Sequence, residues 1–233
     1  MPFNFITFEH YSIDYKRLFN ELNSQKIFND TLIQTQYLHK WMDVLEDCDN
    51  TTKRQLNSIP KILHLRSMLS SEPEIFQNPI LHEDNTIFIH FRISIMKELV
   101  EESKYEGQSI KLSEFTCENS EIRWNPVKGH LDDVYGEKPI ILIPFENNQY
   151  HHLVVDGNHR LTYKINNNQR SIKAIVFSEK SAIEHSVFSS GFDKHYYIMM
   201  NEINYISNRT HYNNSNAKEL ASKSFLIDGK YKF

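Results

Sequence analysis

The sequence contains little cysteine, and the spacing of its two cysteines matches no metal-binding or disulfide pattern. Cys48 and Cys117 are the only cysteines among 233 residues, so neither a disulfide framework nor a cysteine zinc site is expected. The sequence also lacks an HExxH pair and a Walker phosphate loop. It therefore predicts no metal site built from protein side chains, and it favours two reduced thiols in a cytoplasmic protein.

Long apolar runs and an excess of positive charge are missing as well. No run approaches the ~20 apolar residues of a membrane helix, and the first residues lack the basic and apolar parts of a signal peptide, so no membrane partner is expected. Lysine and arginine number 26 against 30 aspartates and glutamates, a net charge of -4. Dedicated nucleic-acid binders carry the opposite sign. A small-molecule substrate is therefore the favoured partner and nucleic acid the less favoured one, while the oligomeric state stays open.

Residues 1–107 are expected to form a mainly helical N-terminal region. Apolar side chains recur there at helical spacing, for example Leu38, Trp41 and Leu45. Asp30 is placed to cap this helix. Pro60 is expected to end or bend the helix that follows.

The pattern changes towards the end of this region. Pro73 and Pro79 predict a loop. Alternating apolar residues then favour a strand, namely Ile87, Ile89 and Phe91. A helix is expected from about Ser94 to near residue 107.

Residues 108–180 are expected to form the main domain of an α+β protein. Apolar runs predict strands over residues 109–115, 139–145, 150–155 and 171–177, with a short helix over residues 160–165. A short polar turn separates the 139–145 and 150–155 strands, which suits a β-hairpin. Residues 181–233 are expected to form a helical C-terminal extension and a tail.

One turn in this domain carries the strongest functional signal. The segment Asp156-Gly157-Asn158-His159-Arg160 joins an expected strand to the short helix. Gly157 allows positive φ, and a helix start offers unpaired amide groups and the positive end of the dipole. With His159 and Arg160 as cationic donors, the turn is typical of a phosphate-binding site.

These elements and motifs together resemble the ParB/sulfiredoxin-like superfamily over roughly residues 108–180. The resemblance rests on Asn125-Pro126-Val127-Lys128, on Pro139-Ile140, on the strand containing Tyr150, on Asp156-Gly157-Asn158-His159-Arg160 and on Ile172-Lys173-Ala174-Ile175-Val176. It implies a mixed sheet with short helices, preceded here by the helical N-terminal region. The Asp-Gly-x-His-Arg form is similar to that of free-serine kinases on the same fold.

The resemblance also implies a ligand and a set of site residues. A nucleotide would lie at the turn, ATP or ADP with CTP as an alternative, together with Mg²⁺ if the protein is a kinase. The implied phosphate-binding residues are Lys128, Gly157, Asn158, His159 and Arg160. The implied catalytic residue is Asp156, and Glu118 and Glu121 are candidates for a second carboxylate that the kinases use after the first strand.

Two departures from the family narrow the expected reaction. Asn158 stands where sulfiredoxins have a nucleophilic cysteine, and an amide cannot make that attack. His159 stands where ParB partition proteins have a second arginine, and no helix-turn-helix pattern follows it. The sequence thus predicts a nucleotide-dependent phosphotransferase, an ATP/ADP-dependent kinase acting on a small hydroxyl-bearing metabolite. Two alternatives remain: a ParB-like nucleotide- or DNA-binding module without metabolite turnover, and a structural turn in which Arg160 pairs with a carboxylate such as Asp132 or Asp133.

Overall fold

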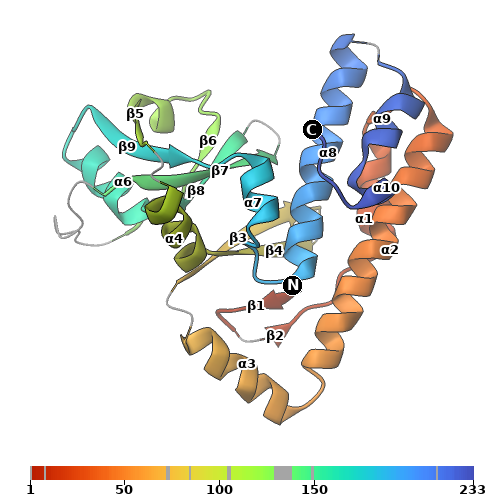
Figure 1. Cartoon of the computed structure of the whole chain (residues 1–233), viewed down its shortest axis with the longest axis horizontal. Coiled ribbons are helices and arrows are strands. Elements are labelled where there is room, and N and C mark those ends of the chain that lie inside the picture. The colour runs from red at the N-terminus through yellow and green to blue at the C-terminus, as the bar shows by residue number, and fades with distance from the viewer. Residues whose placement is uncertain are drawn as a thin grey trace. The chain divides into compact units, whose positions relative to one another are not determined.

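The computed structural model describes residues 2–7, 9–71, 74–83, 85–103, 106–128, 138–147, 150–213 and 215–233. It is an α+β structure, as expected (Figure 1). The chain forms two compact units: unit 1 comprises Met1–Phe91 and Phe188–Phe233, and unit 2 comprises Arg92–Val187. The domain boundaries expected after residues 107 and 180 both lie within unit 2. Whether residues 1–107, 108–180 and 181–233 fold independently stays a prediction.

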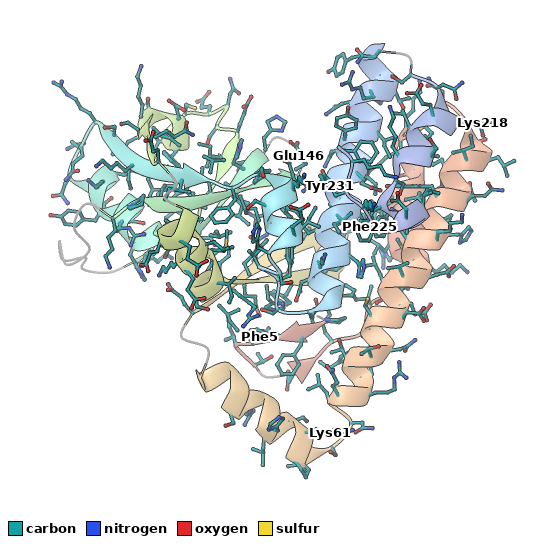
Figure 2. All side chains as sticks on the ribbon, viewed as in Figure 1. Phe5, Lys61, Glu146, Lys218, Phe225 and Tyr231 are labelled. Carbon is teal, nitrogen blue, oxygen red and sulfur yellow. The ribbon has the colours of Figure 1, made fainter. Side chains whose placement is uncertain are left out.

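Unit 1 is built mainly from helices. They are α1 (Tyr15–Ser24), α2 (Thr31–Gln55), α3 (Ile59–Ser71), α8 (Gly191–Asn213), α9 (Ala217–Lys223) and α10 (Phe225–Asp228). Asp30 caps α2 as expected, because its Oδ1 accepts the backbone N–H groups of Leu32 and Ile33. Trp41 of α2 is fully buried and stacks on Phe225, with 6.4 Å between ring centroids. Figure 2 labels Phe225 on α10. The core of unit 1 thus joins α2 to the C-terminal helices.

Two expectations about proline are wrong. Pro60 is the second residue of α3 and not the end of a helix, because a proline in the first helical turn removes an N–H that has no partner there. Pro79 lies within strand β3 (Ile75–His82), where a loop was expected. Among the described residues its sheet has two strands, so β3 is an edge strand, and a proline without an N–H group is accepted on such a strand. Pro73 lies outside the described residues.

The expected strand and helix around residue 92 are confirmed. Strand β4 (Asn85–Arg92) pairs with β3, and helix α4 (Ile93–Ser103) follows it at once. A further small sheet joins β1 (Phe3–Asn4) to β2 (Glu9–His10). The sequence did not predict the β1–β2 sheet, because each of its strands has two residues and therefore shows no alternating pattern.

Unit 2 contains a mixed five-stranded sheet in the order β5-β9-β7-β8-β6. The strands are β5 (Gln108–Lys111), β6 (Ile122–Arg123), β7 (Ile140–Asn147), β8 (Tyr150–Asp156) and β9 (Ser171–Val176). β7 and β8 form the expected antiparallel hairpin. β9 runs parallel to β7, β6 parallel to β8, and β5 antiparallel to β9.

The strand expected over residues 109–115 is only partly correct. β5 ends at Lys111, and the helical turn α5 (Ser113–Thr116) follows. Leu112 and Phe115 are both buried in the core of unit 2. In a continuous strand these two side chains would point to opposite faces, whereas residues three apart in a helix share a face. Burial of both therefore favours the helical turn.

The core of unit 2 holds the start of α6 (Asn158–Asn166) in place. α6 leaves the end of β8 and packs Leu161 into the cluster that contains Ile140, Leu142 and Val154. Each of these side chains is at most 1% exposed, and full burial of one such side chain stabilises the fold by ~1.5–3 kcal/mol. α6 is thereby fixed on the sheet, and α7 (Glu179–Glu184) follows β9.

Candidate functional site

The turn over residues 156–160, called here the 156–160 turn, requires glycine at its second position. Gly157 has φ 92° and ψ 19° and is the N-cap of α6. A Cβ atom there would clash with Ile140 Cγ2 and lie 2.8 Å from Arg160 Nη2. Gly157 has no side chain that could cap the helix, and its backbone O accepts from Leu161 N–H at 2.9 Å. The positive end of the helix therefore has no side-chain cap of its own.

Arg160 forms a buried ion pair with Asp156. Its Nη2 lies 2.8 Å from Asp156 Oδ2, and the two side chains are 10% and 9% exposed. The carboxylates proposed from the sequence as structural partners, Asp132 and Asp133, lie outside the described residues. Arg160 thus has a partner four residues earlier in the chain, on the same turn.

The guanidinium group keeps one buried donor without a described partner despite this pair. Nη2 also donates to Pro139 O at 3.0 Å. Nε is buried and has no acceptor among the described residues. A buried donor without a partner costs ~1–3 kcal/mol, so an acceptor that reached Nε would remove that cost.

Lys97 is a member of the site that sequence reasoning missed. It comes from α4, and its Nζ lies 3.5 Å from Asp156 Oδ1, with 42% of the side chain exposed. Asp156 thus lies between the cations of Lys97 and Arg160. No local pattern could have revealed this, because 59 positions separate Lys97 from Asp156 in the sequence. His159 is exposed on the first turn of α6 and adds an imidazole to the same end of the helix.

Asn158 binds the segment that carries Lys128. Its Oδ1 accepts from Asn125 N–H at 2.9 Å, and its Nδ2 donates to Val154 O at 3.3 Å. One turn later, Thr162 Oγ1 accepts from Val127 N–H at 3.1 Å. These bonds hold the segment that ends at exposed Lys128 against α6. The Asn158 side chain is therefore engaged inside the protein, and the structure brings Lys128 to the side of the helix.

The structure does not bring the two candidate glutamates to Asp156. The backbone O of Glu121 accepts from His151 N–H at 2.8 Å and from His152 N–H at 3.1 Å, near the start of β8. Asp156 ends the same strand, four residues beyond His152 and therefore ~13 Å further along it. Glu118 is exposed in the loop between α5 and β6. Asp156 is thus the carboxylate of the turn, and the glutamates lie elsewhere.

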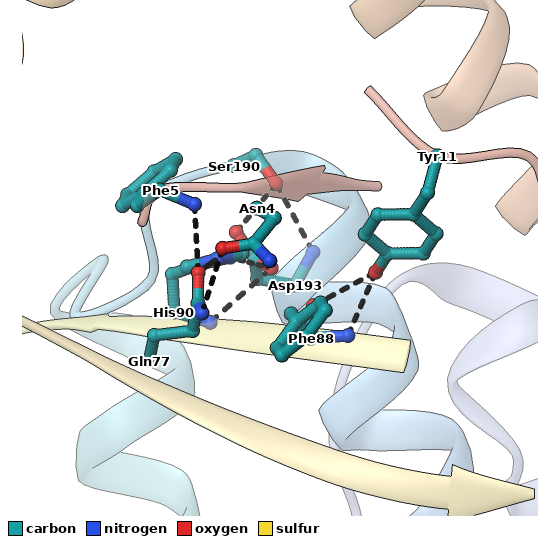
Figure 3. Close-up of polar contacts among 8 residues, drawn as sticks. All are labelled: Asn4, Phe5, Tyr11, Gln77, Phe88, His90, Ser190 and Asp193. Atoms are coloured by element: carbon teal, nitrogen blue, oxygen red, sulfur yellow. Dashed lines mark hydrogen bonds and ion pairs between the residues drawn. The ribbon is translucent and has the colours of Figure 1, made fainter. Parts of the chain in front are cut away.

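A separate polar cluster lies buried in unit 1 (Figure 3). His90 and Asp193 are both fully buried, with 3.0 Å between Nδ1 and Oδ1. His90 Nε2 lies 3.0 Å from Gln77 Oε1, which also accepts from Phe5 N–H. Ser190 Oγ donates to Asp193 and not to the histidine, so the three residues do not form the relay of a serine nucleophile. Burial lowers the pKa of His90 against the opposing pull of Asp193, and the cluster joins β4 to α8 internally.

Neither a membrane-spanning helix nor a metal centre is found among the residues that the structure describes. In the described part of the chain, no helix is both long enough and apolar enough to cross a membrane. No group of three or more His, Cys, Asp or Glu residues there could hold a metal ion. No family model, curated protein or solved structure matches this chain, and the candidate site therefore rests on the residues and distances given above.

Proposed function

We propose that unit 2 binds a nucleotide through its phosphates at the 156–160 turn, in a ParB/sulfiredoxin-like arrangement, and transfers a phosphoryl group to a small hydroxyl-bearing metabolite. One observation carries the proposal. Lys97 and Arg160 reach the same carboxylate, beside a helix start that glycine leaves without a side-chain cap. Two cationic groups thus meet at the helix start, where an anion would lie.

The phosphate contacts follow from the unused donors. The buried Nε of Arg160 needs an acceptor, and a phosphate oxygen can supply one. The Lys97 side chain is 42% exposed, and its ammonium group would contact a phosphate bound at the helix start. Lys128 and His159 are exposed and add an ammonium group and an imidazole near the helix start. ATP or ADP, or CTP, would be held by this set, with Mg²⁺ bound mainly through the phosphates.

Catalysis at this site would depend on positioning and charge neutralisation. Phosphoryl transfer needs little covalent chemistry from the protein. Asp156 is the carboxylate available to orient a substrate hydroxyl or a Mg²⁺-bound water. Glu121 lies towards the other end of β8 and Glu118 is exposed in the loop before β6, so the proposal assigns neither glutamate to this centre.

A second candidate function is a nucleotide-binding module without metabolite turnover. The observation that favours it is the state of Asp156, which is 8% exposed and already bound by two cations. Carboxylate oxygens that are already bound in this way favour a structural role over a catalytic one. In this case the nucleotide would act as a switch, and DNA binding would be a further property of the module.

Thermal unfolding tests nucleotide binding directly. ATP, ADP and CTP are added at millimolar concentration with and without Mg²⁺, and a ligand at 100 times its dissociation constant stabilises the native state by ~2.7 kcal/mol. The double variant Lys128→Ala/His159→Ala should lose most of the shift without losing stability, since both side chains are exposed. Lys180→Ala, an exposed lysine of α7, is the matched control and should keep the shift. Absence of a shift with all three nucleotides would contradict the proposal.

Turnover is then measured separately. Loss of the γ- or β-phosphate signal in ³¹P NMR, seen only when a mixture of small hydroxyl compounds is present, would support the transferase. Nucleotide binding without turnover of any mixture would support the binding module.

A further inference from the structure

Unit 2 contains a recess on the face of the sheet that carries its core. The recess has a volume of about 460 Å³. Its floor is apolar and comes from four strands, with Ile110 of β5, Ile122 of β6, Leu142 of β7 and Val176 of β9. Pockets that bind small molecules are usually concave, with apolar walls and a few polar groups at defined positions.

This recess is separate from the 156–160 turn. His152 lines it, whereas Asp156 ends the same strand, beyond an irregularity of the β7–β8 pairing that lies between Val154 and Asp156. Val154 has no exposed surface and packs against Leu161 in the core. The core therefore closes the path along the strand between the two sites.

The polar rim of the recess is held in one conformation by hydrogen bonds. Ser120 Oγ lies 2.8 Å from Glu114 O and 3.1 Å from Ile122 O, and it accepts from Ile122 N–H at 3.2 Å. Ser120 N–H donates to Cys117 O at 3.1 Å. Trp124 Nε1 donates to Phe115 O at 2.9 Å. A rim fixed in this way loses little conformational entropy when a ligand binds.

The charge of the residues that line the recess favours one sign of ligand charge. Glu114 and Glu121 both line the recess, and no lysine or arginine is among its described lining residues. Burial lowers the pKa of His152, and its ring has no hydrogen-bond partner among the described residues. The recess thus offers two carboxylates, one neutral imidazole and an apolar floor. Charge complementarity disfavours anions there and favours cations.

We propose that this recess binds a small organic cation with a flat apolar body. The ring system would lie on the apolar floor, and the ammonium group would face Glu114 and Glu121. Such a ligand uses both properties of the lining, whereas a carboxylic acid or a phosphate would meet two carboxylates with no compensating cation. The inference concerns a different site from the proposed nucleotide site and does not depend on it.

The test uses three probes that differ in one group: 1-naphthylmethylamine, 1-naphthylmethanol and 1-naphthylacetate. Cys117 lines the recess and is exposed, so a bound probe should shield it from alkylation by iodoacetamide, which is uncharged. Mass spectrometry follows Cys117, and Cys48 of unit 1 is the internal reference. We expect the amine to slow alkylation of Cys117 saturably, the alcohol to bind about tenfold more weakly, and the acetate to give no protection.

Two variants locate the charge effect. Glu121→Gln should weaken protection by the amine about tenfold and leave the alcohol unchanged. Glu118→Gln is the matched control, because this exposed glutamate of the same loop does not line the recess. Each variant is compared with and without probe, so that a changed intrinsic reactivity of Cys117 cancels. Equal protection by all three probes, protection by none, or an equal loss in both variants would overturn the proposal.

Discussion

At the scale of single residues, the ion pair of Asp156 and Arg160 serves the fold before any ligand arrives. Both side chains are about nine-tenths buried, and a buried charge is tolerated only with a partner. Lys97 shares the carboxylate at 3.5 Å, but its side chain is far more exposed. Loss of the arginine alone would leave a carboxylate in a largely closed site with one weaker partner.

Arg160→Ala is therefore expected to lower the free energy of unfolding by ~3 kcal/mol, measured by urea denaturation of the full chain. The double variant Asp156→Asn/Arg160→Met should lose less, because it leaves no unpaired buried charge. Lys180→Ala, which removes an exposed ion pair of 3.9 Å, should stay within ~0.5 kcal/mol of the parent protein. A double variant less stable than Arg160→Ala would contradict this account.

Glu202 is a second residue whose surroundings govern its charge. It is fully buried in α8, and its Oε2 accepts from Tyr37 OH at 3.1 Å and from Ser224 Oγ at 2.8 Å. Oε1 accepts from Phe225 N–H at 2.6 Å, at the start of α10. Burial raises the pKa of Glu202 above its ordinary value of 4.5, although these donors oppose the shift.

The sign of the pH effect follows from that direction. Because the folded pKa lies above the unfolded one, the unfolded state loses its proton first as pH rises above 4.5. Stability from this group is fully present below that value and declines until the folded pKa is passed. The free energy of unfolding of Glu202→Gln, measured by urea denaturation, should therefore rise relative to that of the parent protein as the pH is raised from 4.5 to neutral. Parallel curves for the two proteins would exclude this role, and Glu46→Gln, at an exposed position of α2, is the control.

At the scale of elements, the start of α6 depends on one backbone angle. Gly157 has φ 92°, a conformation in which a side chain is strained. A Cβ atom would also meet Ile140 on β7. The strand-to-helix turn therefore combines a conformational requirement with a steric one, and both fall on the same residue.

Gly157→Ala is expected to cost at least ~1–2 kcal/mol from the backbone angle alone, with more from the contact with Ile140. In an Ile140→Ala background, which lacks Cγ2, Gly157→Ala should cost less, because most of the steric part is then removed. Gly191→Ala at the start of α8 is the matched control, since its nearest side-chain contacts would be 3.6 and 4.0 Å, and it should be neutral or stabilising by ~0.5–1 kcal/mol. Thermal unfolding of these variants and of the Ile140→Ala background gives the ranking, and equal effects of the two glycine substitutions would refute it.

At the scale of the whole molecule, unit 2 is an insertion in the chain of unit 1. Its two ends are adjacent, because Arg92 N–H donates to Val187 O at 2.8 Å. The cut ends of unit 1 are adjacent too, with a bridge between Phe91 and Phe188 and a bond from Ser189 N–H to His90 O at 3.1 Å. Insertions with neighbouring ends interrupt the host fold little.

Residues 92–187 should therefore fold as a separate fragment. Unit 1 should fold when Phe91 and Phe188 are joined by an Asn-Gly loop, which suits a two-residue hairpin. The two tryptophans fall one in each piece, Trp41 in unit 1 and Trp124 in unit 2. Fluorescence during urea denaturation then reports each piece by itself, and a cooperative transition is expected in both. A piece without such a transition would show that its core needs the other unit.

The sequence by itself determined what depends on near neighbours in the chain. The β7–β8 hairpin, the glycine turn, the capping of α2 by Asp30 and the switch from strand to helix near residue 92 were all predictable, because each follows from local spacing and backbone preference. Only the tertiary structure decided the rest. The helical turn α5 buries Phe115, and Pro79 lies in a strand of a two-stranded sheet. Lys97 lies beside Asp156, whereas Glu121 lies ~13 Å from Asp156 along β8. These outcomes depend on which distant segments pack together, and burial and pairing free energies across the chain outweigh local preference there.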